Sequence, residues 1–140
     1  MATFAQVRQA VQNQVETVAG YKIVPFPPQY FRRITNTISH KGFTVDMQTT
    51  NDEGERQRRG TTYVSSTCRV LFCYRLRPKD ILTDYDNSMT DEQSIITAVL
   101  QSYESIQTGI QVRYNRSTRD IPDSMDYMIT TLEFTILHTL

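Results

Sequence analysis

The chain of 140 residues lacks any run of about 18 apolar residues, so no transmembrane helix is expected. It also lacks an excess of either charge, because 15 basic residues balance 15 acidic ones. A balanced charge gives no overall reason to expect nucleic acid or an anionic membrane as the main partner. The opening MATFAQVRQAVQNQ is amphipathic rather than apolar, and no signal peptide is expected in it.

Cysteine is scarce, with Cys68 and Cys73 as the whole supply. The two residues lie five positions apart in a predicted strand, so their side chains point to opposite faces and cannot bond to each other in a straight strand. There is no CxxC pair and no disulfide framework. This usage suits folding in a reducing cytosol.

Motifs for catalysis and phosphate binding are absent as well. No serine stands in a GxSxG setting, and no GK[ST] follows Gly54 or Gly60 to make a phosphate-binding loop. The two histidines, His40 and His138, are far apart in sequence. We therefore expect no catalytic residue and no cofactor.

A calcium loop is the one metal site worth testing. Asp84, Asp86 and Ser88 fit its first, third and fifth positions. Met89 and Ile95 stand where such a loop requires glycine and a bidentate glutamate, so we expect no metal.

Two strand-like runs around a charged loop dominate the sequence between Phe43 and Arg77. Phe43, Val45 and Met47 alternate with polar residues in the first run. The second run, Thr61–Arg77, keeps one period, with apolar residues on its even positions: Val64, Cys68, Val70, Phe72, Tyr74 and Leu76. This alternation is typical of strands with one buried face, and an antiparallel hairpin is the most economical pairing.

The second strand is unusually long. About 17 residues at roughly 3.3 Å each would span on the order of 55 Å, whereas a common strand has about 5 or 6 residues. A compact domain of this size cannot bury such a ribbon, so the strand bends or the hairpin projects as an arm. A projecting arm needs a partner, which indicates an assembly protein.

The remaining chain predicts three helices and two more strands. Thr3 to Ala19 is expected to be a helix, with Thr3 and Gln6 as a capping box and Gly20 as its stop. The proline-rich segment 23–28 should be extended, and 29–39 a short helix. Further on, a helix is expected over 94–106, opened by a capping box of Thr90 and Gln93, then strands over 110–115 and 128–140.

The predicted fold class is α+β, in the order α-α-β-β-α-β-β. A four-stranded antiparallel or mixed sheet should carry its helices on one face, leaving the other face to solvent or a neighbouring subunit. We expect one domain over 1–140, with 51–60 as the tip of a long projecting hairpin and 78–90 as an acidic loop.

Opposite charges suggest a subunit contact between these two loops. We expect basic residues of the hairpin tip to dock onto acidic residues of a neighbour's loop; they are Arg56, Arg58 and Arg59, and Asp80, Asp84 and Asp86. In the alternative interpretation the acidic segment is a solvated loop, and Asp91 and Glu92 favour the start of the next helix through its dipole.

Arginines on the exposed strand faces allow two interpretations. Arg69, Arg75 and Arg113 could line a channel that carries nucleic acid. No aromatic side chains interleave with them as in a base-stacking platform, so a mixed-charge solvated face is favoured.

The expected elements follow one another in a characteristic order along the chain. An amphipathic helix comes first, followed by a hairpin with a long charged loop, whose second strand runs into RLRPKDILTDYDN, and then by a helix and two strands. In length, element order and general character, nearly the whole chain resembles the tail terminator proteins of long-tailed bacteriophages. The resemblance implies a hexameric ring at the head-proximal end of the virion tail, assembled in the host cytoplasm. Such a ring caps the tail tube, stops its polymerisation and offers a surface to the head connector.

The partners that the resemblance implies are other copies of the chain, the tail tube protein and the head–tail connector or stopper protein. DNA would only pass through the lumen of the ring, and no membrane is involved. Two alternatives remain: another head–tail connector component, such as a stopper or completion protein, and a small cytosolic α+β enzyme or ligand-binding domain.

Overall fold

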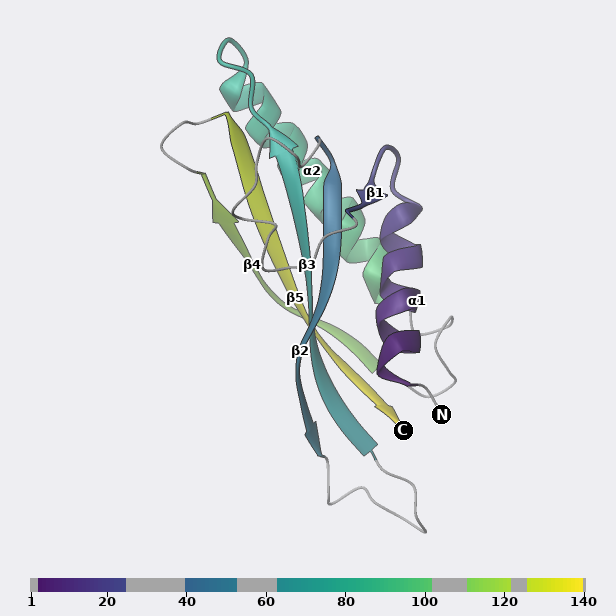
Figure 1. Ribbon diagram of the computed structural model, residues 1–140. Coiled ribbons are helices and arrows are strands. Elements are labelled where there is room, and N and C mark those ends of the chain that lie inside the picture. The colour runs from purple at the N-terminus through teal and green to yellow at the C-terminus, as the bar shows by residue number, and fades with distance from the viewer. Residues whose placement is uncertain (1–2, 25–39, 53–62, 102–110, 122–125, 140) are drawn as a thin grey trace.

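The computed structural model describes residues 3–24, 40–52, 63–101, 111–121 and 126–139. Its order is α1 (Phe4–Glu16), β1 (Lys22–Ile23), β2 (Gly42–Asp52), β3 (Tyr63–Arg75), α2 (Ile81–Leu100), β4 (Gln111–Asp120) and β5 (Tyr127–Thr139). The strands form a five-stranded mixed sheet in the order β1-β2-β3-β5-β4 (Figure 1). The α+β class is confirmed, with one strand more than expected.

The first helix forms as its sequence predicts. The Thr3 hydroxyl accepts a hydrogen bond from the Gln6 backbone N–H at 3.2 Å, and the Gln6 side chain accepts one from the Thr3 N–H at 2.9 Å. Val7, Val11 and Val15 are fully buried along one stripe. Gly20 follows the helix with a φ of 85°. A residue with a side chain would be strained in this backbone conformation.

The hairpin of β2 and β3 is also confirmed, but it is part of the sheet. β3 pairs with β2 on one side and, from Tyr63↔Thr139 to Arg75↔Tyr127, with β5 on the other. Its even positions are buried from Val64 to Tyr74. The long strand is thus accommodated by an equally long neighbour, and most of the predicted hairpin tip over 51–60 lies outside the described residues.

The helices cover one face of the sheet, as expected (Figure 1). Valines of α1 together with Ile95 and Val99 of α2 pack on the inward side chains of the strands, which are Phe43, Val45, Cys68, Val70, Phe72, Leu132, Phe134 and Ile136. A second, smaller cluster comprises Val24, Leu71, Cys73 and Ile129. The alternation along β3 places that cluster on the opposite face.

The two cysteines are free and buried, one in each cluster, so the expectation that they do not bond to each other is confirmed. Burial raises the pKa of the Cys68 thiol to about 12 and that of Cys73 to about 11. Both thiols therefore stay protonated and unreactive near neutral pH.

The expected acidic loop over 78–90 is wrong from Ile81 onward, because α2 begins there. The helix expected over 94–106 is confirmed as far as Leu100, but it starts at Ile81 rather than at Ser94, and 102–106 lie outside the described residues. Thr90 is not an N-cap: its hydroxyl donates to the Asp86 carbonyl at 3.2 Å within the helix. The buried positions of α2 before Ile95 are polar, namely Asp84, Ser88 and Glu92. This part of the helix therefore has no apolar stripe. The partners of its buried carboxylates lie elsewhere in the chain.

Three further differences concern the strands and the segments outside the described residues. β1 was not predicted; it pairs in parallel with β2 only at Gly42 and Phe43. β4 continues to Asp120, past a bulge between Tyr114 and Arg116. The predicted short helix over 29–39 and most of the proline-rich segment lie outside the described residues.

Candidate interaction surfaces

The three aspartates expected to form one acidic docking site lie in different environments. Asp80 and Asp86 are exposed, at the start and in the second turn of α2. Asp84 is only 3% exposed. Its carboxylate accepts hydrogen bonds from the Arg77 backbone N–H at 2.7 Å and from the Arg77 Nη2 at 3.0 Å. Asp84 thus joins the end of β3 to α2 within one subunit, and Asp80 and Asp86 remain exposed for a partner.

These contacts with Arg77 hold the pKa of Asp84 below its ordinary value. A carboxylate whose pKa is lower in the folded state stabilises the fold above its unfolded pKa, and that contribution is lost as pH falls through the folded value. We expect Asp84→Asn to be less stable than the parent at pH 7, and to lose less further stability on acidification below about pH 4. Urea unfolding across this pH range measures the difference.

The exposed Asp86→Asn variant is the matched control, and its acid profile should follow the parent. Equal acid dependence of the Asp84→Asn variant and the parent would show that the Arg77 contacts do not contribute to stability.

Arg56, Arg58 and Arg59 lie outside the described residues, but the strands on either side of them are placed. β2 ends at Asp52 and β3 begins at Tyr63, at one end of the sheet (Figure 1). α2 begins beyond the opposite end of β3. Since β3 has 13 residues, the two ends are roughly 40 Å apart. The end of the sheet that carries Asp52 and Tyr63 therefore comes beside Asp80 or Asp86 of another copy when that copy is displaced along the strands.

A row of alternating charges crosses the helix-free face of the sheet, and sequence analysis did not find it. Its members stand in register on four neighbouring strands, in the order Asp46, Arg69, Glu133 and Arg116. Arg69 Nη2 lies 3.0 Å from Asp46 Oδ2, and Arg116 Nε lies 3.5 Å from Glu133 Oε2. The acidic partners of Arg69 and Arg116 agree with a mixed-charge face rather than a basic channel.

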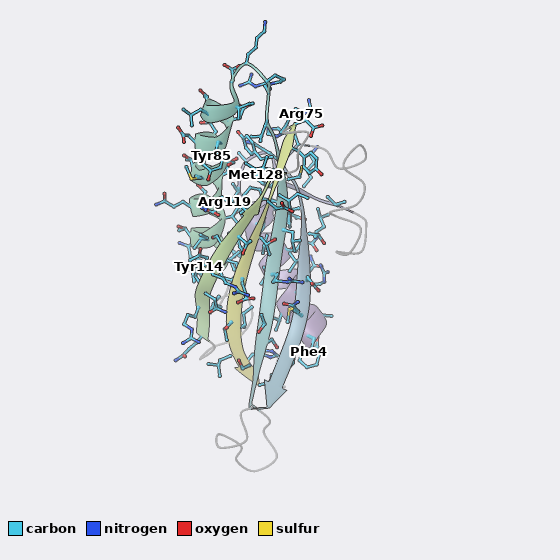
Figure 2. All side chains as sticks on the ribbon, turned by 90° about the vertical axis from the view of Figure 1, so that its left-hand side faces the viewer. Phe4, Arg75, Tyr85, Tyr114, Arg119 and Met128 are labelled. Carbon is cyan, nitrogen blue, oxygen red and sulfur yellow. The ribbon has the colours of Figure 1, made fainter. Side chains whose placement is uncertain are left out.

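A polar hollow of about 270 Å³ opens at the end of the sheet near Arg75, the end opposite Phe4 (Figure 2). Its lining consists of His40, Tyr74, Arg75, Arg77, Asp84 and Asn87. His40 Nδ1 accepts a hydrogen bond from the Arg75 backbone N–H at 3.1 Å. Partial burial, with help from Lys41 and Arg75, lowers the pKa of His40, so the ring is neutral at pH 7.

Ser66 and His138 meet in the structure although they are far apart in the chain. The Ser66 Oγ lies 3.0 Å from the His138 Nε2. Both are buried, at 0% and 2% exposure, and the Phe4 ring packs edge-on against the imidazole. Thr50 extends the group through its hydroxyl, 3.1 Å from Ser66. This polar group lies beside Phe4 at the start of α1 and joins β2, β3 and β5.

Within the described part of the chain, no three metal-ligating side chains gather into a possible metal site. None of the helices described is both long and apolar enough to cross a bilayer.

Comparisons with known proteins bear on the fold. No protein-family model matches the chain, and no curated protein matches its sequence. Among solved structures, a chain in the virion of a native gene transfer agent (GTA) particle is similar, with a TM-score of 0.57 at 10% sequence identity. The similarity covers 99% of this chain and 96% of that one. The two chains share a fold along nearly their whole lengths.

Proposed function

We propose that this chain is a structural protein of a phage-like virion, and within it a ring-forming tail terminator. The observation that carries the proposal is the likeness, end to end in both chains, to a protein of the GTA virion. The sequence adds the element order of tail terminators. The exposed Asp80 and Asp86 and the charge row on the helix-free face are surfaces that suit a role in assembly.

In this role, six copies form a ring on the head-proximal end of the tail tube. The ring stops tube polymerisation and presents a surface to the head–tail connector, while DNA passes through its lumen. Each subunit needs two different patches to make such a ring. A stopper or completion protein of the same joint is the second candidate, since the likeness to a virion chain supports it equally.

The experiment is to add the purified chain to the tail tube protein of the same virus during tube growth. A terminator will shorten the tubes in proportion to its concentration, and negative-stain images will show a six-fold ring at one tube end. A chain that stays monomeric beside growing tubes, with no change in their length, would contradict the terminator role. Binding to the connector protein but not to tubes would favour the stopper.

We also propose that the hairpin tip, through Arg56, Arg58 and Arg59, contacts acidic residues of a partner. Asp80 and Asp86 of a copy displaced along the strands fit this contact, so that copy is a partner other than the neighbour at the same level of the ring, whereas the buried Asp84 is already bound by Arg77.

Charge reversal tests the tip. Arg58→Glu/Arg59→Glu should weaken the tip contact about tenfold at low salt, because exposed ion pairs contribute roughly 0.2–1 kcal/mol each and reversal adds repulsion. The loss should fade as salt rises. Sedimentation at several salt concentrations measures it.

Lys22→Glu, an exposed reversal on β1 away from the tip, is the control. Adding Asp80→Lys/Asp86→Lys to the tip variant should restore the contact. Unchanged association of the tip variant would remove this proposal.

A further inference from the structure

The charge row on the helix-free face ends in opposite charges at opposite sides of the sheet. Asp46 stands on β2 and Arg116 on β4, which lie toward opposite sides of the sheet (Figure 2). The Arg116 side chain is 72% exposed, and that of Asp46 is 25% exposed. A guanidinium has five donors and a carboxylate about four acceptor positions, so each can bind a second partner.

Among the described residues, the two strands that carry these ends also have open edges, and β4 is the last strand on its side of the sheet. β1 pairs with β2 only as far as Phe43, and among the described residues no strand lies beside β2 from Thr44 onward. The Phe43 carbonyl accepts a hydrogen bond from the Val24 N–H at 2.8 Å, so it points away from β3. Because backbone groups alternate in direction along a strand, those of Val45 and Met47 also point to this open edge.

The strand directions suit a contact between copies in the same orientation. β2 is antiparallel to β3, β3 to β5, and β4 to β5. β2 and β4 of one subunit therefore run in opposite directions. When one copy is placed beside the next without being turned over, β4 of the first and β2 of the second are antiparallel neighbours, and their helix-free faces are continuous.

We propose that subunits join by antiparallel pairing of β4 with β2 of the next copy, with Arg116 beside Asp46 of that copy. This inference rests on the proposed ring and names its subunit contact. The alternating row then continues from one subunit to the next, each acidic residue standing between two arginines. Opposite charges on directly facing residues stabilise a strand pair, whereas like charges would destabilise it.

Backbone geometry agrees with this register. The backbone N–H and C=O of Val45 point to the open edge of β2, so those of Asp46, the next residue, point toward β3. Alternation across the sheet makes Asp46–Arg69 a hydrogen-bonded pair, Arg69–Glu133 a non-hydrogen-bonded pair and Glu133–Arg116 a hydrogen-bonded pair. Arg116 and Asp46 then meet as a non-hydrogen-bonded pair, the kind with the closest side chains.

The same row favours a closed ring over a filament. It runs across the strands, so joining its two ends places successive subunits at the same level. A head-to-tail contact without displacement along the axis closes into a ring, whereas one with displacement builds a helical filament.

Cysteine cross-linking tests the pairing. Asp46→Cys and Arg116→Cys are made as separate variants and mixed at high concentration under mild oxidation, which traps transient contacts and needs no preformed ring. We expect a disulfide-linked dimer containing one copy of each variant, at least tenfold more abundant than in the control. The double variant Asp46→Cys/Arg116→Cys should give a ladder of linked species.

Glu16→Cys, exposed on α1, mixed with Arg116→Cys is the matched control, and oxidised parent protein reports the background of the two buried native thiols. Circular dichroism spectra like that of the parent show that the variants fold. Cross-linking of folded Asp46→Cys and Arg116→Cys no greater than in the control would overturn the pairing and would mark these edge charges as guards against aggregation.

The outcome separates the contact from the function. If rings form at tube ends but the cross-link does not, the proposed terminator role stands and the proposed strand contact is wrong. A cross-linked ladder from a protein that does not shorten tubes would support the contact and reject the terminator role.

Discussion

Replacing Phe72 by alanine will lower the free energy of unfolding by about 3–5 kcal/mol. Phe72 is fully buried in the middle of β3, with strands on both sides and the helices above. The Tyr21 ring packs against it edge to face, with centroids 5.6 Å apart. Because Tyr21 is itself fixed by a 2.8 Å hydrogen bond to Asp91 of α2, the cavity cannot easily collapse. Urea unfolding followed by circular dichroism measures the loss.

Leu82→Ala is the control for Phe72→Ala. The Leu82 side chain is 73% exposed on α2, and its truncation should change stability by less than about 0.5 kcal/mol. A loss under about 1 kcal/mol for Phe72→Ala would mean that the core as described is not the one that stabilises the chain.

Replacing Arg119 by methionine will lower the free energy of unfolding by about 3 kcal/mol, because the carboxylate of Glu92 is then buried without its counter-charge. Arg119 Nη2 of β4 contacts Glu92 Oε2 of α2, and Glu92 is 6% exposed. The other carboxylate oxygen of Glu92 has no hydrogen-bond partner among the described residues. The arginine is thus the group that compensates for burial of this acid, and unfolding by urea measures its removal.

Two companion variants decide whether the counter-charge is the cause. Arg116→Met removes another arginine–glutamate pair of β4, but an exposed one, and should cost less than about 1 kcal/mol. Glu92→Met/Arg119→Met removes both charges and should recover most of the stability lost by Arg119→Met, since apolar replacements of buried ion pairs are often neutral. Equal losses in the single and double variants would attribute the effect to packing.

The sequence predicts those elements whose buried face is apolar. The valine stripe of α1 and the alternation in β2, β3 and β5 identify them, and Thr3 locates the start of α1. The part of α2 before Ile95 escapes detection, because Asp84 and Glu92 occupy buried positions there and their partners, Arg77 and Arg119, belong to the end of β3 and to β4. No local pattern reveals a helix whose buried side is completed by arginines from distant elements.

The candidate surfaces show the same limit. Exposed charges such as Asp80 and Asp86 can be read from composition, but the row that ends at Asp46 and Arg116 depends on the register of four strands. Two bulges, between Met47 and Thr49 and between Tyr114 and Arg116, set that register. The position of a bulge is hard to predict from the sequence. The alignment of these charges is therefore known only once the pairing of the strands is known.

The two buried cysteines give the chain a pair of natural chemical reporters. Cys68 faces the helices and Cys73 the other side of the same strand. With their thiols protonated and covered, each can react with a maleimide only when its own side of the sheet opens. The labelling rates of the two sites therefore distinguish detachment of the helices from loosening of the opposite face, in unmodified protein and in every stage of assembly.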